Sequence, residues 1–402
     1  MKKARQTGYS SRARHQAGFS LIELMIAIAI GLLILAGMLT VFVNTSAARN
    51  EIDLMNRQIE NGRYATELLR DDIQLSSFYG EIDMIKIRLA PGLPVTVPDP
   101  CATSLAERSD GGNVGILLVH VQGIDNFDPA TSTELDSCPT IKSAVKPGTD
   151  IIVIRRVKTC TAVTPVPAPL PAGVCADPLS NGKAYMQISL CGLLAPVSTS
   201  GITTHALAVY PRPTEFVHRL KGANCAAATA APLRPYVIYM YFVGTDNILK
   251  RVEFVDGTGM HINNVMPLVD GIENLQVEYG VDATDDGNAD GAYKSAAEIK
   301  ALAPAAAVAD WSNVVTVKVN LLARNTERSP SYTDSKTYDL GQFPGTIKTS
   351  ANNNVPTTVI AGRTLYGPWS SLPATDPDIA YRRHVYSSLV RITNVSARRE
   401  RP

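Results

Sequence analysis

Residues 19–43 read FSLIELMIAIAIGLLILAGMLTVFV, and this run decides how the rest of the chain is organised. Its 25 residues include one charged side chain, Glu23. At about 1.5 Å per residue, a helix of this length spans roughly 37 Å, which exceeds the roughly 30 Å of a bilayer hydrocarbon core. The run therefore predicts a membrane-spanning helix over residues 19–43.

The residues before this run are basic and include no acidic side chain. Five positive side chains precede the run: Lys2, Lys3, Arg5, Arg12 and Arg14. Positive residues next to a membrane span stay on its cytoplasmic side, so the chain after Val43 is predicted to be translocated. A secretory signal peptide has a shorter apolar region followed by a cleavage site of small residues, and this run is too long for that class.

Gly18 stands before the apolar run, in the string GFSLIELMIA, and Glu23 follows it five residues later. This string resembles the class III leader of type IV prepilins and pseudopilins. The resemblance implies that residues 1–18 are a leader, that a prepilin peptidase cuts between Gly18 and Phe19, and that Phe19 is then N-methylated. The implied mature chain has 402 − 18 = 384 residues.

Glu23 is an acid at membrane depth. A charged side chain there costs about 2.5 to 3.5 kcal/mol on insertion scales and is usually paired. Cleavage creates an α-amine on Phe19, one helical turn before Glu23, and the resemblance implies that this carboxylate pairs with the Phe19 amine of a neighbouring subunit. An amine–carboxylate pair within one helix and a hydrated acid near the membrane interface are the alternatives.

A helical pattern continues through residues 44–80. Apolar side chains recur there at spacings near three and four: Ile52, Met55, Ile59, Leu69 and Ile73. Charged residues fall elsewhere, which favours an amphipathic helix packed on a folded domain. A coiled coil is the alternative, but the stripe is short and Gly62 interrupts it. We expect one long helix from residue 19 to about residue 78, half in lipid and half against the domain.

The string IENGRYATELLRDDIQLSSFYG at residues 59–80 extends the resemblance. It is similar to the second half of the first helix in PilW-type minor pilins. Three later stretches fit the same family in order: ENLQVEYGVDATDDGN, VVTVKVNLLARN and RRHVYSSLVRITN. The resemblance covers residues 16–80, 273–325 and 382–394, and it does not extend to residues 90–235.

Beyond Gly80 the sequence changes to short apolar runs broken by proline, glycine and Asx residues, which is typical of a β-sheet. The predicted strands are residues 115–122, 150–157, 184–190, 236–243, 249–255, 273–281, 314–322 and 385–393. Residues 81–235 are expected to form a β-rich region with cysteine-bearing insertions, and residues 236–402 a β-rich C-terminal region. The predicted fold class is α+β, with a long pilin-type helix packed on a large, mainly antiparallel β-rich domain.

All six cysteines lie in the region that is predicted to be exported: Cys101, Cys138, Cys160, Cys175, Cys191 and Cys225. An even number of cysteines in an exported chain predicts disulfides. Six cysteines allow 15 pairings, and the choice stays open, although Cys160 with Cys175 would close a loop of 15 residues. Zinc is the alternative, but the chain has no Cys-x-x-Cys pair, so the usual pattern of a structural zinc site is missing.

The segment DATDDGNADGAY resembles the start of a calcium-binding loop. It places suitable residues at the first, third, fifth and sixth positions of such a loop: Asp286, Asn288, Asp290 and Gly291. The twelfth position, which should supply a bidentate acid, is Ala297, and Glu298 comes one place late. Two interpretations stay open, a weak calcium site and a solvated turn between two strands. No other cofactor is expected.

Composition and motifs argue against several functions. The chain has 38 Lys and Arg against 37 Asp and Glu, and this net charge of +1 predicts no nucleic-acid partner. Its sequence has no Gly-x-Ser-x-Gly, no His-Glu-x-x-His and no phosphate-binding loop, and its six histidines are scattered. The chain is therefore predicted to be a structural protein and not an enzyme.

The resemblance implies a minor pilin of the type IV pilus that acts in pilus initiation or at the pilus tip. Its implied partners are other minor pilins, the major pilin, the prepilin peptidase and the inner membrane. Its implied location is the inner membrane with a periplasmic domain, and then the pilus on the cell surface. Two alternatives stay open, a large minor pseudopilin of a type II secretion system and a pilus-tip adhesin that binds through residues 90–235.

Overall fold

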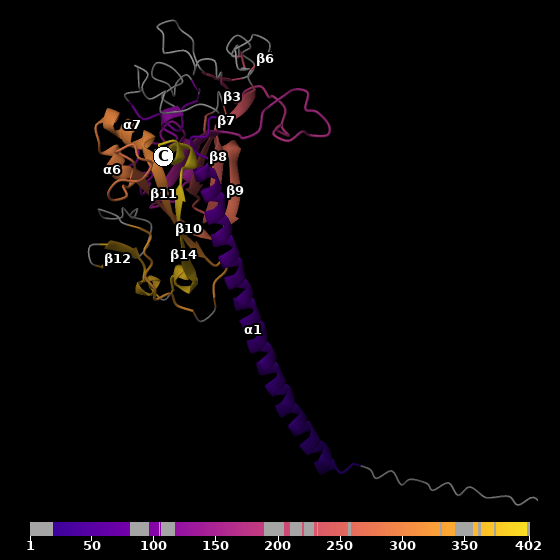
Figure 1. Cartoon of the computed structure of the whole chain (residues 1–402). Coiled ribbons are helices and arrows are strands. Elements are labelled where there is room, and N and C mark those ends of the chain that lie inside the picture. The colour runs from indigo at the N-terminus through magenta and orange to yellow at the C-terminus, as the bar shows by residue number, and fades with distance from the viewer. Residues whose placement is uncertain are drawn as a thin grey trace, which may run out of the picture. The chain divides into compact units, whose positions relative to one another are not determined.

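The computed structural model describes residues 19–80, 96–103, 105, 117–188, 205–209, 219–220, 229–230, 232–255, 259–329, 332–341, 357–360, 363–373 and 375–399. The chain divides into two compact units, Met1–Asp53 and Leu54–Pro402. Helix α1 (Leu21–Gln74) contributes to both units (Figure 1). In the described part of the chain, the first unit is helical and every strand belongs to the second unit.

The described residues of the second unit form a seven-stranded sheet in which every pairing is antiparallel. Five strands have the order β1 (Val121–Ile124), β2 (Ile151–Val157), β7 (Leu233–Val243), β3 (Ala184–Ile188) and β4 (His205–Val209). Strand β8 (Ile248–Glu253) also pairs with β7, and β9 (Val265–Asp270) pairs with β8. The predicted boundary between the two β-rich regions, at residue 235, falls within β7. Both predicted regions therefore contribute to this sheet.

A second antiparallel sheet has the strand order β10 (Ile272–Val281), β11 (Val314–Arg324) and β14 (Arg383–Arg391). Two ribbons pair β12 (Thr357–Ile360) with β13 (Arg363–Tyr366), and β5 (Arg219–Leu220) with β6 (Thr229–Ala230). The shorter helices are α4 (Pro139–Ala144), α6 (Ala296–Lys300), α7 (Pro304–Ser312) and α8 (Thr393–Arg399). Turns of 3₁₀-helix occupy Ile262–Asn264, Trp369–Ser371 and Pro377–Ala380. The predicted α+β class, a long N-terminal helix with an antiparallel β-rich domain, is confirmed.

The prediction of a strand over residues 115–122 is wrong for most of its length. Among the described residues of that segment, 117–118 are helical, and β1 begins only at Val121. Here the backbone carbonyl oxygens of Leu118 and Val119 form hydrogen bonds with side chains, and in a strand these oxygens would pair with a neighbouring strand. Arg155 donates to the carbonyl oxygen of Val119 at 2.9 Å, and both ring nitrogens of buried His120 lie within hydrogen-bonding distance of carbonyl oxygens.

Helix α1 ends at Gln74, a few residues earlier than predicted. Ser77 has a φ of 60°, which is incompatible with a continuing right-handed helix. Its backbone N–H donates to the carbonyl oxygen of Arg155 at 3.2 Å. The chain therefore leaves the helix because a backbone group there bonds to strand β2.

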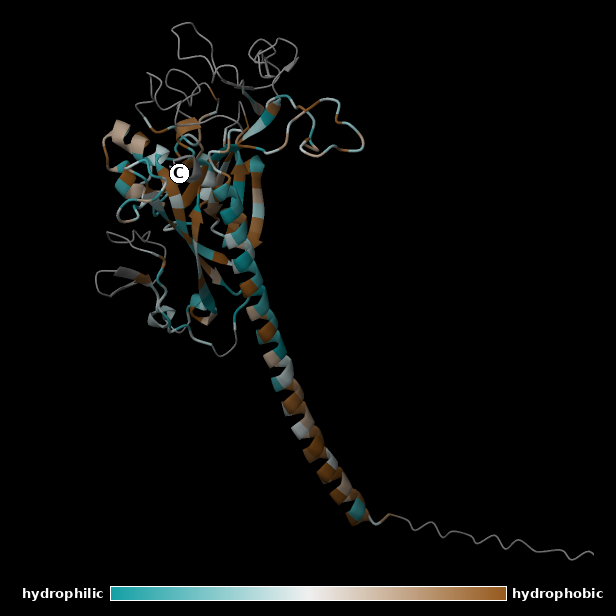
Figure 2. Cartoon of the chain, in the orientation of Figure 1, coloured by the Kyte–Doolittle hydropathy of each residue, from teal (hydrophilic) through white to brown (hydrophobic). Residues whose placement is uncertain are grey.

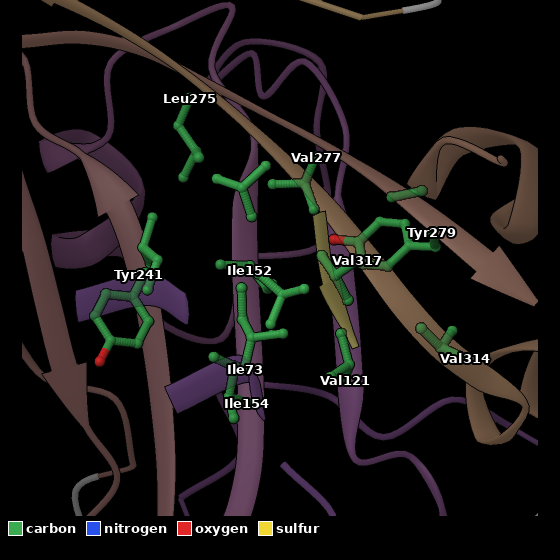
Figure 3. Close-up of a cluster of buried hydrophobic side chains, with 14 of the residues drawn as sticks. Ile73, Val121, Ile152, Ile154, Tyr241, Leu275, Val277, Tyr279, Val314 and Val317 are labelled. Atoms are coloured by element: carbon green, nitrogen blue, oxygen red, sulfur yellow. The ribbon is translucent and has the colours of Figure 1, made fainter. Parts of the chain in front are cut away.

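Strands β2 and β7 bury both of their faces. On β2, Ile152 and Ile154 belong to one hydrophobic cluster, whereas Ile151, Val153 and Val157 belong to another. Figure 3 shows Ile152 and Ile154 in the first cluster, together with Ile73 of α1 and Val277 of β10. Burial on both faces explains why these strands read as continuous apolar runs.

A buried ion cluster holds β14 to β10. Arg383 donates to Glu273 at 2.6 Å and to Asp334 at 3.1 Å, and all three side chains are almost fully buried. Burial alone would raise the pKa of Glu273, but Arg383, Lys146 and Arg324 outweigh it and lower the pKa to about 2. The Glu273 carboxylate is therefore held in its charged form by cations from three separate segments.

Candidate assembly site

Ser20 and Glu23 define the N-terminal end of α1. The Ser20 hydroxyl accepts a hydrogen bond from the backbone N–H of Ile22 at 3.3 Å, and the Glu23 carboxylate accepts one from the backbone N–H of Ser20 at 3.3 Å. This reciprocal arrangement resembles a capping box, and it also places a negative charge at the positive end of the helix dipole. Glu23 thus has a hydrogen-bond partner within its own chain, Ser20. Its pairing with the Phe19 amine of a neighbouring subunit stays a prediction.

The first half of α1 has no packing partner among the described residues. Every large apolar side chain from Leu21 to Val43 is more than half exposed, and Phe19 is 87% exposed. Figure 2 shows this half of the helix as predominantly hydrophobic. In the described part of the chain, α1 is the one helix that is long and apolar enough to cross a membrane. Gly18 lies outside the described residues.

The second half of α1 packs on the folded unit, but with a different face from the one predicted. Leu69 and Ile73 are buried, whereas Ile52, Met55 and Ile59 are exposed. The face that is buried consists of Leu54, Gln58, Gly62, Ala65, Leu69, Asp72 and Ile73. These positions follow the helical period, but three of them are polar or glycine, so an apolar pattern could not identify the whole face.

Two of the unexpected positions make specific contacts. The Gln58 amide donates to the backbone carbonyl oxygens of Ala323 at 2.9 Å and Arg382 at 3.0 Å. Gly62 lies directly against the ring of Tyr386, where any added Cβ would overlap the ring. Gly62 therefore permits the close approach of α1 to strand β14, so the residue that interrupts the apolar stripe is itself part of the packed face.

Asp72 anchors the end of α1 to the seven-stranded sheet. Its carboxylate accepts hydrogen bonds from Arg156 at 2.5 and 3.1 Å and from the Tyr241 hydroxyl, and Arg251 lies 3.7 Å away. Burial and the Asp72 carboxylate both raise the pKa of Tyr241. The Arg251 guanidinium also stacks 4.3 Å from the centroid of the Tyr239 ring. This network joins one helix to three strands.

Two disulfides are present in the described part of the chain, which confirms the expectation of disulfide bonds for four of the cysteines. Cys101 is bonded to Cys138, and Cys160 to Cys175. Each bond closes a loop, of 37 and 15 residues respectively. The other two cysteines, Cys191 and Cys225, lie outside the described residues.

The loop after β10 satisfies its carboxylates internally. One oxygen of Asp290 accepts hydrogen bonds from the N–H of Ala283 and from the N–H and hydroxyl of Thr284, at 2.8 to 3.0 Å, and these bonds lower the pKa of Asp290. Asp286 accepts from the N–H of Asn288 at 2.8 Å. The described residues hold no group of three His, Cys, Asp or Glu side chains placed to bind a metal ion. Calcium binding by this loop stays a prediction.

Helices α6 and α7 were missed by the sequence reasoning, and the calcium-loop pattern runs into the first of them. Glu298, considered there as a late calcium ligand, accepts a hydrogen bond from the Ser295 N–H at 2.7 Å in a capping box. The loop therefore connects β10 to a helix and not to a strand. The Ser-x-x-Glu spacing and Pro304 at the start of α7 were the available signals.

Comparison with known families places two matches on this chain. A model described as "Type IV Pilus-assembly protein W" matches residues 240–394, and one described as "Prokaryotic N-terminal methylation motif" matches residues 13–39. The chain is similar to type IV pilins over these two segments. The first match on this pilin-like protein includes the three-stranded sheet, and the second includes Gly18, Phe19 and Glu23. The predicted resemblance to PilW-type pilins is thereby confirmed.

A comparison of this pilin-like protein with curated proteins found no match. Among solved structures, it is similar to a type IV-like pilin from Thermus thermophilus, with 15% sequence identity and a TM-score of 0.21. That alignment covers 54% of this chain and 87% of the other chain.

Proposed function

We propose that this pilin-like protein is a minor pilin of the type IV pilus that acts as an initiating or tip subunit. The observation that carries the proposal is an exposed apolar helix that begins with the methylation motif and continues into a large β-rich domain. Pilin-type families are structural, and we extend that role to this chain. The other minor pilins and the major pilin are the proposed partners.

Processing is the first proposed step. A prepilin peptidase cuts between Gly18 and Phe19, and the new Phe19 amine is N-methylated. The basic leader keeps the N-terminus in the cytoplasm until the cut, because positive residues resist translocation. The apolar half of α1 is consistent with anchoring in the inner membrane, and the folded unit is then held on the periplasmic side.

Assembly is the second proposed step, and it uses Glu23. A cationic amine at the N-terminus of a helix lies at the positive end of the helix dipole, which is unfavourable unless a carboxylate is near. The Glu23 carboxylate already lies at this end of α1 through its bond to the Ser20 N–H. Side-by-side packing of two apolar helices brings the Glu23 carboxylate of one subunit to the Phe19 amine of its neighbour.

The processing step is tested with Gly18→Val, which places a branched side chain next to the scissile bond. We expect the leader to remain attached, as shown by mass spectrometry of the membrane fraction. The wild-type chain should begin at N-methylated Phe19, and any other mature N-terminus contradicts the processing step.

The assembly step is tested with Glu23→Val in a strain that lacks the wild-type gene. We expect normal insertion and cleavage but loss of the protein from sheared pili, and a reduced number of pili. Ser20→Ala is the matched control, because it removes the helix cap and keeps both partners of the amine–carboxylate pair. Normal pili with Glu23→Val would contradict the pairing, and loss of protein secretion with normal pili would assign the chain to a type II secretion system.

A further inference from the structure

A cavity of about 1130 Å³ lies within the second unit, next to the end of strand β1. The residues that line it come from segment 96–100, the end of β1, the turn at 131–134, and helices α6 and α7. Ile124, Ala307 and Trp311 contribute apolar surface to its wall. The cavity therefore has a mixed lining of apolar and polar residues, as binding pockets have.

The charged groups of the cavity are mainly acidic. Its described lining includes three acids, Asp99, Asp125 and Glu134, against one basic residue, Lys300. Lys300 is already paired with one oxygen of Glu134. The second oxygen of Glu134 and the side-chain oxygen of Asn126 are buried and have no hydrogen-bond partner among the described residues. Asp99 already accepts hydrogen bonds from the Cys101 N–H and the Ser137 hydroxyl, and Asp125 accepts one from the Asn126 side chain. The described wall thus keeps two unsatisfied acceptors, one on Glu134 and one on Asn126.

Asp125 lies opposite a second carboxyl group. The register of β1 and β2 pairs Ile124 with Ile151, so Asp125 and Asp150 occupy the next opposing positions. Asp150 is 3% exposed, and its two oxygens accept backbone N–H groups of Asn126 and Val277 at 2.8 Å. Like charges in opposing positions are destabilising. Burial raises the pKa of both carboxyl groups, and the Asp125 charge raises that of Asp150 further.

A third polar group lies against the same wall. Tyr279 is 1% exposed, and its hydroxyl has no hydrogen-bond partner among the described residues. That hydroxyl lies against Gly123, and a Cβ at Gly123 would also meet Ala296; Gly123 and Ala296 both line the cavity. A buried hydroxyl without a partner costs free energy, but Tyr279 does not itself line the cavity, so it marks only the polar character of this region.

We propose that this cavity binds an arginine side chain presented by a partner protein. A guanidinium group carries five N–H donors and no acceptor, which suits a wall with unsatisfied acceptors on Glu134 and Asn126. Its positive charge complements the net negative lining and pairs with Asp125. Its aliphatic stem packs on apolar surface such as Ile124 and Trp311. The site requires only the folded second unit, so it does not rest on the proposed role in pilus assembly.

Calorimetric titration of the full chain in detergent micelles tests this assignment. The probe is acetyl-Gly-Arg-Gly-amide, and the control peptide carries citrulline, which has nearly the same shape but no charge. We expect saturable binding of the arginine peptide, about tenfold or more tighter than that of the citrulline peptide, because hydrogen bonds to charged groups are the stronger class. Equal affinities, or no saturable binding in the millimolar range, would overturn the proposal.

Asp125→Asn separates binding from folding. The substitution removes the charge that pairs with the guanidinium, and it also relieves the repulsion with Asp150. We therefore expect binding to weaken about tenfold or more while the melting temperature stays the same or rises. Asp270→Asn is the matched control, because Asp270 is exposed on β9 and does not line the cavity. Unchanged binding by Asp125→Asn would overturn the proposal even if the protein remains folded.

Proton release gives a second readout. Asp125 is faced by Asp150 before β2, Glu298 on α6 and Tyr279 on β10, and the Lys300–Glu134 pair lies in the same cavity. Because the Asp125 pKa is raised, a bound cation displaces a proton from the carboxyl pair at low pH. The affinity for the arginine peptide should therefore rise with pH, and the heat of binding should depend on the ionisation enthalpy of the buffer. An affinity that falls with rising pH would contradict the pairing with Asp125.

Discussion

The two halves of helix α1 have the same backbone conformation but opposite surroundings. From Leu21 to Val43, every large apolar side chain is more than half exposed, whereas Leu54, Leu69 and Ile73 in the second half are buried. The first half is apolar on all sides, and the second half has one buried face that includes Gln58 and Asp72. Helical geometry is therefore common to both halves, and the chemistry of their side chains determines which medium each half requires.

Glycine residues show the same difference. An added Cβ at Gly31 or Gly37 would meet no atom within 4 Å, but at Gly62 it would overlap the ring of Tyr386. Gly62 is thus required by packing within the chain. Gly31 and Gly37 have open space around them, and small residues of this kind permit close approach of helices in membranes. The same residue type is packed against a side chain in one half and is surrounded by open space in the other.

The largest effect on folding is expected from Asp72→Ala in the second half. The change leaves Arg156 and Arg251 without their carboxylate and the Tyr241 hydroxyl without its acceptor. Removing one partner of a buried charge pair typically lowers the free energy of unfolding by about 3 to 5 kcal/mol. Urea unfolding, followed by tryptophan fluorescence of the full chain in detergent, measures this loss. Asp71→Ala is the control, because Asp71 is exposed, and equal stability of the two variants would refute the anchoring role.

Truncating one leucine in each half should show that only the second half contributes to the stability of the folded unit. Leu69→Ala removes a fully buried side chain and should lower the free energy of unfolding by about 2 to 5 kcal/mol. Leu33→Ala truncates a side chain that is 74% exposed, and we expect no change in the same urea transition. A comparable loss from Leu33→Ala would show that the apolar half also packs on the folded unit.

Acid should weaken the folded unit through Glu273. The pKa of this carboxyl is about 2 in the folded chain and about 4.3 in an unfolded one. The folded state therefore binds fewer protons, and the contribution of Glu273 is complete above about pH 4.3 and is lost as the pH falls toward 2. Melting temperatures measured across this range should fall more steeply for wild type than for Glu273→Gln. Parallel curves would exclude Glu273 as the group responsible.

The smallest effect concerns the loop that precedes α6. Asp290→Ala removes the acceptor for three hydrogen bonds at an exposed site, so we expect a small decrease in the melting temperature in the presence of a chelator. Melting of wild type with millimolar calcium tests the remaining metal prediction. A calcium-dependent rise that is absent from the Asp286→Ala, Asp290→Ala double variant would assign the ion to this loop. Identical melting curves with calcium and with chelator would exclude calcium binding, and the loop would then be a solvated turn.

Local patterns in the sequence were sufficient to predict the long helix and many of the strands. The apolar run from Phe19 predicted the membrane-type helix, and continuous or alternating apolar runs located β2, β7, β10, β11 and β14. These predictions succeeded because each depends on neighbouring residues that share one periodicity. The motif around Gly18, Phe19 and Glu23 was equally recognisable, because its residues are contiguous in the chain and match the methylation motif.

The tertiary structure alone decided the features that join distant segments. Asp72 bonds to residues 84 and 169 positions away, and the register of β1 and β2 brings Asp125 opposite Asp150. Neither Gln58 nor Gly62 was identified as a packing residue, because the first contacts a carbonyl group 265 residues away and the second a ring on β14. Pairing of Cys101 with Cys138 likewise depends on the fold. Sequence patterns reveal which side chains avoid water, whereas buried polar groups, small residues and disulfides depend on partners that only folding brings together.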